Sequence, residues 1–470
     1  MHSRAIIRER GNTTKRHRLH PAQVVVSGFA LTILGGTALL MLPNARVGPG
    51  GASFLEALFT ATSAVCVTGL TVVDTAVYWT PFGQVVILLL IQIGGFGIMS
   101  FASVVGLAIA RKLSLRSRIT AAAETKSVGL ADVKGLVLGV VRISLAIEVT
   151  VAMLLALRFM FGYGEPVGRA IWLGVFHSVS GFNNAGFALF SDNLMGYATD
   201  AWICLPIAAA VILGGLGFPV IVQLWRQLRQ PGRNPRHCLQ RAWSIRTWTM
   251  NTRIVVAGTL VLLVLGTAYI TAVEWSNPNT LGPLDGPGKL LAGFFQAVQT
   301  RTAGFNSVDI GQLDSATLLG MDILMLIGGG PAGTAGGIKI TTFAVLFFII
   351  WTEVRGQVAV NVFGKRLSRA VHREAITIAL LAVGVIIAAT TALMLMTDIS
   401  LDALLFETIS AFATVGLSTG ITAGLPWGGQ VILILLMFIG RLGPITFASA
   451  IALRERHNTY ELPKERPIIG

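Results

Sequence analysis

Eight apolar runs, each long enough to cross a membrane, constrain this chain more than any other feature. About 20 apolar residues cross the hydrocarbon core as a helix, and lipid offers no partners for unpaired backbone groups. The sequence is 53% hydrophobic and 12% charged, and its mean hydropathy is +0.72. We therefore predict an all-α polytopic membrane protein with eight transmembrane helices. The runs lie at about 22–42, 82–110, 135–161, 203–225, 254–274, 317–352, 375–397 and 427–453.

The basic residues gather on one side of these predicted spans. The formal net charge is +14, and the basic residues concentrate at the N-terminus and in segments 111–134, 226–253, 354–373 and 454–466. Cytoplasmic loops carry an excess of Lys and Arg, so this pattern explains the charge without a nucleic-acid partner and predicts that both termini are cytoplasmic. Segment 226–253 holds seven arginines and no acid, which favours anionic lipid as a partner.

Several other classes of protein are disfavoured. The first apolar run lacks a small-residue cleavage site, so we interpret it as a retained helix and not as a secretory signal. The three cysteines have no CxxC spacing, which argues against a disulfide framework or a zinc site. We identify no nucleophile, metal cluster or acid–base pair, and we predict that the chain is not an enzyme. His177 is interpreted as a packing or polar-contact residue.

A phenylalanine followed ten positions later by a glycine recurs four times. The four glycines are about 115 residues apart, which is the signature of an internal repeat. Tight turns between spans would explain one such glycine but not four matched ones. Each repeat is therefore predicted to be a helix, a re-entrant pore loop and a second helix, arranged around one central pore. The pairs are Phe59 and Gly69, Phe176 and Gly186, Phe294 and Gly304, and Phe406 and Gly416.

This repeat divides the chain into segments with different expected roles. Residues 1–21 are a basic cytoplasmic N-terminus, and residues 454–470 are a cytoplasmic C-terminus. The four repeats occupy 22–116, 117–228, 254–356 and 357–453, with a basic cytoplasmic linker at 229–253.

The glycines of the four loops are predicted to form an ion selectivity filter. Glycine adopts positive φ without a Cβ penalty, so successive carbonyls can turn toward an axis and replace an ion's water shell. Short helices would precede the filter and direct their negative C-terminal ends at the cation; Ser53 and Glu56 fit a capping box that opens the first one. The predicted filter residues are Val67, Thr68, Gly69, Asn184, Ala185, Gly186, Thr302, Ala303, Gly304, Thr414, Val415 and Gly416.

An acidic residue follows three of the glycines by five or six positions. These are Asp74, Asp192 and Asp309. They are compatible with helix capping or local turn formation, or with an outer vestibule that concentrates cations, and the sequence leaves both readings open.

A second glycine motif lies in the second helix of each repeat, as in Ile93–Gly97 and Leu213–Gly217. Small residues allow helices to pack closely, and we interpret these first two copies in that way. The third copy continues through Pro331 to Lys339 and contains too many glycines to stay helical. It is not a phosphate loop, because no Gly-Lys-Ser/Thr follows. We predict a broken helix there.

In the fourth copy Arg441 replaces a glycine, and a charge at mid-membrane is usually retained for a function. We predict that the broken stretch and Arg441 form a gate below the filter; the alternative is that Arg441 only links helices. The predicted gate residues are Gly328, Gly329, Gly330, Gly333, Thr334, Gly336, Gly337, Lys339 and Arg441.

The loop sequences resemble the Ktr/Trk/HKT superfamily of potassium transporters, and within it the KtrB membrane subunits of bacterial Ktr systems. The matching stretches are Ala64–Leu70, Asn183–Phe187, Thr300–Asn306 and Ala413–Leu417, with the glycine-rich third-repeat stretch and Arg441. Trk-type subunits carry an extra N-terminal helix pair, for which a first span near residue 22 leaves no room.

The resemblance implies a channel-like potassium uptake subunit in the bacterial inner membrane, with K⁺ bound at the filter glycines. It also implies a homodimer with one pore per subunit and a cytosolic, KtrA-like, nucleotide-binding regulatory ring. Na⁺ as activator or coupling ion stays open. The alternative is a sodium-coupled secondary transporter with midplane binding at broken helices; the sparse candidates for its paired ionisable residues are Arg142, Glu148 and Asp322.

Overall fold

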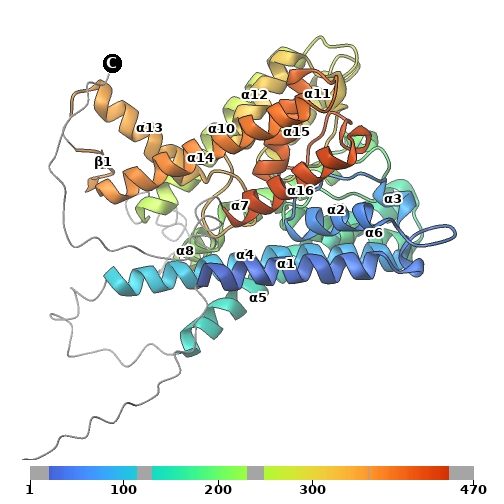
Figure 1. Cartoon of the computed structure of the whole chain (residues 1–470), viewed down its shortest axis with the longest axis horizontal. Coiled ribbons are helices and arrows are strands. Elements are labelled where there is room, and N and C mark those ends of the chain that lie inside the picture. Colours follow the sequence, from blue (N-terminus) through green and yellow to red (C-terminus); the bar gives the residue numbers. More distant parts are fainter. Residues whose placement is uncertain (1–20, 114–129, 230–247, 358, 444–470) are drawn as a thin grey trace, which may run out of the picture.

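The computed structural model describes residues 21–113, 130–229, 248–357 and 359–443, and these are mostly helical (Figure 1). The two strands among them, β1 (Asn361–Val362) and β2 (Lys365–Arg366), form a small antiparallel hairpin. The predicted cytoplasmic termini lie almost entirely outside the described residues, as does most of the basic linker. The end of the last predicted span, beyond residue 443, lies outside them too.

The helices follow one another in four groups that each contain long and short members. The first group is α1 (Pro21–Leu40), η1 (Pro43–Ala45), α2 (Phe54–Val65), α3 (Thr75–Tyr78) and α4 (Pro81–Leu113). The second is α5 (Leu130–Tyr163), α6 (Val167–Phe182), η2 (Met195–Tyr197), α7 (Ala201–Leu216) and α8 (Phe218–Arg229). The third is α10 (Met250–Glu274), α11 (Gly286–Gln299), η4 (Ile310–Gln312), α12 (Ser315–Leu326) and α13 (Ile340–Val354). The fourth is α14 (Arg369–Met394), α15 (Leu401–Ala413), η5 (Thr422–Gly424) and α16 (Trp427–Leu442).

The first helix of each group contains a segment long and apolar enough to cross a membrane. These segments are Gln23–Leu40, Val137–Tyr163, Met250–Glu274 and Arg369–Met394, and α7 with α8 makes a fifth if the bent pair is one span. The other predicted spans fall on shorter apolar helices among the described residues, including α12, α13 and α16. Four or five such spans are thus found, and the number eight stays a prediction.

The first glycine of the repeated helix motif packs against a short helix in three of the four groups. A Cβ added at Gly94 would overlap the carbonyl oxygen of Val65, at the end of α2. Gly214 meets the Phe182 carbonyl in the same way, and Gly440 meets that of Phe412. Close packing, as predicted for the first two copies, is therefore what these glycines permit.

Two of the second helices are interrupted. The chain bends by 101° between α7 and α8 at Gly217, whose φ is +89°. Between α12 and α13 the chain leaves the helix over residues 328–339, which confirms the predicted break. The bend at Gly217 was not predicted, because a packing role was assigned to that copy of the motif.

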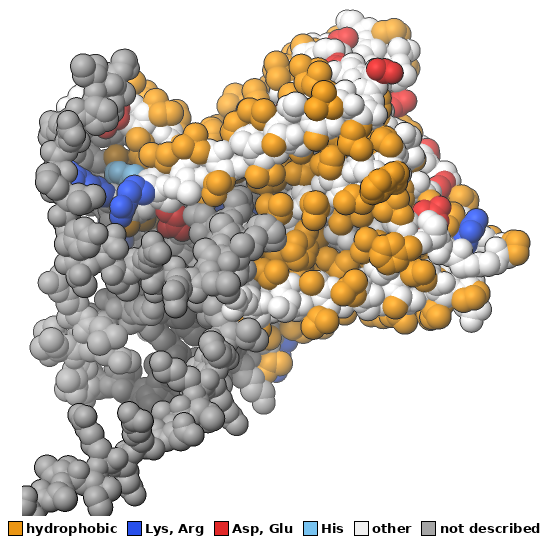
Figure 2. All heavy atoms as spheres, in the orientation of Figure 1, with side chains coloured by type: hydrophobic (Ala, Val, Ile, Leu, Met, Phe, Trp, Pro, Cys, Tyr) orange, Lys and Arg blue, Asp and Glu red, His pale blue; other side chains and the backbone are white. Residues whose placement is uncertain are grey.

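The exposed surface of the helices suits a hydrocarbon environment. Leu31, Leu260 and Leu380 are 69%, 64% and 69% exposed, and Figure 2 shows apolar side chains across the middle of one face. Acidic side chains gather at the right-hand end of that view, the end at which α3 lies in Figure 1. Such a distribution is typical of a membrane protein with a polar rim.

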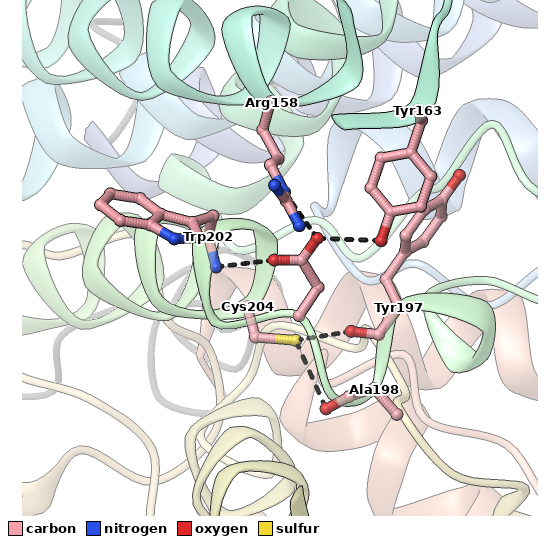
Figure 3. Close-up of polar contacts among 7 residues, drawn as sticks. Arg158, Tyr163, Tyr197, Ala198, Trp202 and Cys204 are labelled. Carbon is pink, nitrogen blue, oxygen red and sulfur yellow. Dashed lines mark hydrogen bonds and ion pairs between the residues drawn. The ribbon is translucent and has the colours of Figure 1, made fainter. Parts of the chain in front are cut away.

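A carboxylate ties the C-terminal end of α5 to α7 (Figure 3). Asp200 caps α7 by accepting the backbone N–H of Trp202 at 2.9 Å. Its Oδ2 lies 2.8 Å from Nε of Arg158 and accepts the hydroxyl of Tyr163 at 2.9 Å. Because Asp200 is buried and Arg158 and Tyr163 both lie on α5, this cluster fixes the distance between the two helices.

Candidate functional site

The four predicted filter loops share an unusual backbone conformation. Gly69, Gly186, Gly304 and Gly416 have φ values of 96°, 69°, 78° and 92°. The residue two positions before each glycine is also left-handed: Val67, Asn184, Thr302 and Thr414 have φ values of 55°, 61°, 72° and 50°. Positive φ is uncommon for residues with a side chain and concentrates at functional sites. The loops thus have matched geometry although their sequences differ.

The four glycines lie against one another's loops in chain order and close a ring. A Cβ at Gly69 would overlap the backbone carbonyl of Ala185, which is the residue before the next glycine. In the same way, a Cβ at Gly186 would overlap the carbonyl of Ala303, one at Gly304 that of Val415, and one at Gly416 that of Thr68 in the first loop. Because each obstacle is backbone, no side chain fits at any of the four positions without moving a neighbouring loop.

Short helices hold these loops through their last turns. In the first loop Ser63 accepts two N–H groups: that of Thr68 at its carbonyl (2.8 Å) and that of Gly69 at its hydroxyl (3.0 Å). Ser410 makes the same pair of contacts in the fourth loop, with Val415 at 2.8 Å and Gly416 at 3.1 Å. These bonds satisfy backbone groups that leave the helix.

The predicted capping box at the start of α2 is confirmed. Ser53 Oγ accepts the N–H of Glu56 at 3.4 Å, and the Ser53 N–H donates to the Glu56 carboxylate at 2.8 Å. The hydroxyl of Tyr78 donates to the same carboxylate at 2.8 Å. Burial and this hydrogen bond raise the pKa of Tyr78 to about 12, so its hydroxyl stays a donor. The pair therefore fixes α2 against α3.

A buried carboxylate supports the second loop from behind. Glu148 on α5 accepts the side-chain amide of Gln92 at 3.0 and 3.1 Å and that of Asn183 at 3.2 Å. Asn183 ends α6 and precedes Asn184 of the predicted filter. Glu148 is 4% exposed and makes no ion pair in the part of the chain that the structure describes. This support was missed from the sequence, because its partners are 56 and 35 residues away.

The 328–339 segment is a non-helical stretch of turns and bends that pairs with the break in α7. Gly330 N–H donates to the Gly215 carbonyl at 2.7 Å, and Thr334 N–H donates to that of Gly214 at 3.1 Å. In return, Phe218 N–H donates to the Ala332 carbonyl at 3.2 Å. These three bonds satisfy backbone groups that both breaks release, as burial requires.

The same segment lies directly against the second and fourth loops. The hydroxyl of Thr334 is 2.9 Å from the side-chain amide of Asn184. A Cβ at Gly336 would overlap the hydroxyl of Thr414. The structure thus brings the predicted gate residues together with the predicted filter.

Two buried arginines reach the 328–339 segment. Nη1 of Arg441 donates to the carbonyl of Thr334, and Nη2 of Arg301 donates to that of Gly328 at 3.5 Å. Arg441 is 5% exposed, and its Nε and Nη2 have no hydrogen-bond partner among the described residues. Arg441 thus hydrogen-bonds to one carbonyl among the described residues, although its guanidinium has five N–H donors. Arg301 was not among the predicted gate residues. Its charge, within a predicted pore loop, could have identified it from the sequence.

The three acids predicted for a vestibule each accept a nearby backbone N–H. Asp74 accepts the N–H of Ala76 at 2.8 Å, Asp192 that of Gly196 at 3.0 Å, and Asp309 that of Gly311 at 3.0 Å. Asp74 also lines a cavity of about 310 Å³, together with Gly69, Gly186 and Thr422. Asp74 and Asp309 therefore cap the short helices α3 and η4, Asp192 stabilises a local turn, and Asp74 also lies beside this cavity.

Comparison with known proteins places these features in a family context. The sequence model of the TrkH family, described as cation transport protein, matches residues 8–459. The chain is 38% identical to Ktr system potassium uptake protein B of Bacillus subtilis (strain 168), covering 94% of this chain and 95% of that protein. It is 38% identical to the protein of the same name from Vibrio alginolyticus, covering 95% and 94%.

Two further relatives widen the comparison. Potassium/sodium uptake protein NtpJ of Enterococcus hirae is 33% identical to this chain, and the match covers 97% of the chain and 98% of that protein. The crystal structure of the potassium transporter TrkH from Vibrio parahaemolyticus superimposes with a TM-score of 0.71 at 17% identity, covering 94% of this chain and 86% of the other. At that identity the likeness concerns the fold.

Proposed function

The chain belongs to the TrkH family of cation transport proteins, and we propose that it takes up potassium ions through a single channel-like pore per subunit. The closed ring of four glycine loops carries this proposal. Each loop has the same left-handed positions and places the carbonyl before its glycine against a neighbouring loop. Carbonyl oxygens grouped in this way can replace the water around a monovalent cation. The 38% identity to two potassium uptake proteins supports potassium as the ion.

In this proposal the 328–339 segment and Arg441 form the gate. The segment lies beside Asn184 and Thr414 of the ring, and Arg441 holds its Thr334 carbonyl. A fixed positive charge at this level opposes a permeating cation. Opening then requires the segment to leave its partners, and a movement of the flanking helices α12 and α13 would drive it.

We place the pore under the control of a separate cytosolic nucleotide-binding subunit. Two relatives are named as components of a Ktr system, which implies further components. A homodimer in the bacterial inner membrane, with both termini in the cytoplasm and anionic lipid at the basic segments, completes the proposal. Asp74, lining the 310 Å³ cavity beside Gly69, is the acid best placed to attract cations at the outer mouth.

The test is uptake of radioactive rubidium into liposomes that contain the purified protein. A potassium-loaded interior provides the driving gradient, and protein-free liposomes and a Gly416→Ser variant are the controls. We expect rubidium uptake that excess external potassium abolishes and that Gly416→Ser reduces or makes less selective. A correctly folded protein that admits no rubidium in this assay would refute the proposal.

A sodium-coupled secondary transporter is the second candidate. The broken helices at Gly217 and 328–339 and the likeness to a potassium/sodium uptake protein favour it. Against it, neither Glu148 nor Asp322 forms an ion pair among the described residues, and Arg142 is exposed. Coupling would make rubidium uptake depend on the direction of the sodium gradient, whereas a pore would respond only to the gradient of its own ion.

A further inference from the structure

A polar side chain on three of the short helices faces the outer limb of its own loop, meaning the residues that follow the glycine. Nε2 of His177 on α6 accepts the backbone N–H of Leu189 at 3.3 Å. Oε1 of Gln296 on α11 lies 3.5 Å from the N–H of Ser307 and accepts it. Glu407 on α15 also contacts the limb that follows its glycine, because its Oε1 accepts the hydroxyl of Thr422. In the first two the donor is the backbone N–H of the third residue after the glycine.

The three acceptors lie at the same place in the repeat or one residue from it. His177 and Glu407 lie nine positions before their glycines, and Gln296 lies eight before Gly304. All three side chains are fully buried, at 0% exposure. A buried donor that loses its acceptor pays its full desolvation cost, so each contact fixes the outer limb at a defined distance from the short helix. The same device thus recurs although the side chains differ.

Further contacts orient these acceptors. His177 Nδ1 lies 2.8 Å from the Leu173 carbonyl, so Nδ1 carries the proton and Nε2 of the neutral ring is free to accept. The His177 ring stacks on Phe190, with centroids 4.9 Å apart. Glu407 Oε1 accepts the hydroxyl of Thr422, a residue that lines the cavity above the loops. Each acceptor is therefore built into its surroundings.

The first repeat lacks this link and supplies an internal comparison. Thr60 stands nine positions before Gly69, in the place of His177 and Glu407. Its hydroxyl is buried and has no hydrogen-bond partner in the described part of the chain. The outer limb of the first loop is consequently held without a contact of this kind from Thr60.

We propose that His177, Gln296 and Glu407 are positioning residues that set ion discrimination by holding three of the four outer limbs. Their shared feature is an acceptor atom and not a charge, since one is an imidazole, one an amide and one a carboxylate. The limb begins at the ring glycine, so a limb that relaxes outward changes the spacing of the carbonyls around the ion. The inference rests on the proposed pore, because discrimination is defined only if the ring conducts.

The experiment compares substitutions that remove the acceptor with one that keeps it. His177→Phe preserves the stacking ring, Gln296→Met and Glu407→Met preserve the side-chain length, and Glu407→Gln preserves an acceptor oxygen. Thr60→Val is the matched control. Rubidium and sodium uptake are measured in liposomes, and hydrogen exchange is followed in peptides that contain the limb N–H groups.

The acceptor-free variants are expected to lower the ratio of rubidium to sodium uptake about tenfold, as the loss of a buried hydrogen bond implies, and to speed exchange of their own limb. Thr60→Val and Glu407→Gln should stay within about twofold of the parent. Unchanged ratios in His177→Phe and Gln296→Met would overturn the proposal even if Glu407→Met does not fold. A Glu407→Gln variant as impaired as Glu407→Met would overturn it too, because charge would then be decisive. Failure of the pore itself is recognised separately, since the parent protein would take up no rubidium while exchange in the variants still reported the limb contacts.

Discussion

Removing the Arg441 guanidinium is predicted to favour the open state of the proposed gate. Arg441 donates to the Thr334 carbonyl within a buried site. A hydrogen bond from a charged donor contributes about 1.5–3 kcal/mol, and about 1.4 kcal/mol corresponds to a tenfold change in an equilibrium constant. If the bond exists only in the closed state, Arg441→Ala shifts the equilibrium toward opening roughly 10- to 150-fold. Loss of the charge acts in the same direction.

The measurement is the initial rate of rubidium uptake into liposomes, normalised to the amount of folded protein and made without any partner subunit. Arg355→Ala is the control, because it removes one arginine from the exposed end of α13, where the guanidinium stacks on Trp351 at 4.3 Å from the ring centroid. Deletion of residues 333–336 should raise the rate further, since it removes Thr334 itself. A rate in both variants no greater than that of the parent, with normal insertion, would show that the 328–339 segment is a structural break and not a gate.

Three further predictions concern the ring, the buried carboxylates and the contact between α5 and α7. Gly69→Ser should lower the ratio of rubidium to sodium uptake about tenfold. A side chain at this position would overlap the Ala185 carbonyl, and its φ of +96° costs about 1–2 kcal/mol for an L-residue. An unchanged uptake ratio in the folded variant would contradict the filter assignment. Glu148→Gln should alter the ratio of rubidium to sodium uptake, because Glu148 contacts Asn183 beside the second loop. Glu274 is also a buried carboxylate and accepts the hydroxyl of Thr317 at 2.5 Å, and Glu274→Gln should lower only the melting temperature. Equal uptake ratios in the two variants would refute this distinction. Asp200→Ala should lower the melting temperature by several degrees, since it removes a helix cap and leaves Tyr163 without its acceptor; an unchanged melting temperature would contradict this.

The features that could be predicted from the sequence are those that local chemistry decides. Positive φ at Gly69 follows from a glycine in a short loop after a helix, and the capping box follows from Ser53 and Glu56 three residues apart. The break at 328–339 follows from Pro331 and its many glycine neighbours, which no helix tolerates. Each of these depends on residues within a few positions of one another.

The bend at Gly217 could not be predicted, because its motif nearly repeats that of Ile93–Gly97, which stays within the continuous helix α4. The difference lies in the surroundings. A Cβ at Gly217 would come within 2.5 Å of the Pro331 carbonyl, so the 328–339 segment approaches closely only because this residue has no side chain. The Glu148 cluster escaped prediction for the same reason, since distant segments assemble it.

The two breaks also depend on each other energetically. Unpaired backbone groups at membrane depth cost several kcal/mol each. The 328–339 segment satisfies part of its own, since the Gly328 N–H donates to the Ile338 carbonyl at 2.8 Å and the Ile340 N–H donates to that of Gly329 at 3.0 Å, and further groups of the two breaks pair with each other. The Gly214 and Gly215 carbonyls, at the end of α7, accept the N–H groups of Thr334 and Gly330, and the Ala332 carbonyl accepts that of Phe218. If the 328–339 segment withdraws to open the pore, the Gly214 and Gly215 carbonyls lose their donors. Either water must then hydrogen-bond to these carbonyls, or α8 must move to shield them. Opening of the proposed gate would thus be coupled to the orientation of α8, whose last residues belong to the basic segment 226–253. The proposed cytosolic partner, bound at that segment, would then have a direct mechanical route to the gate.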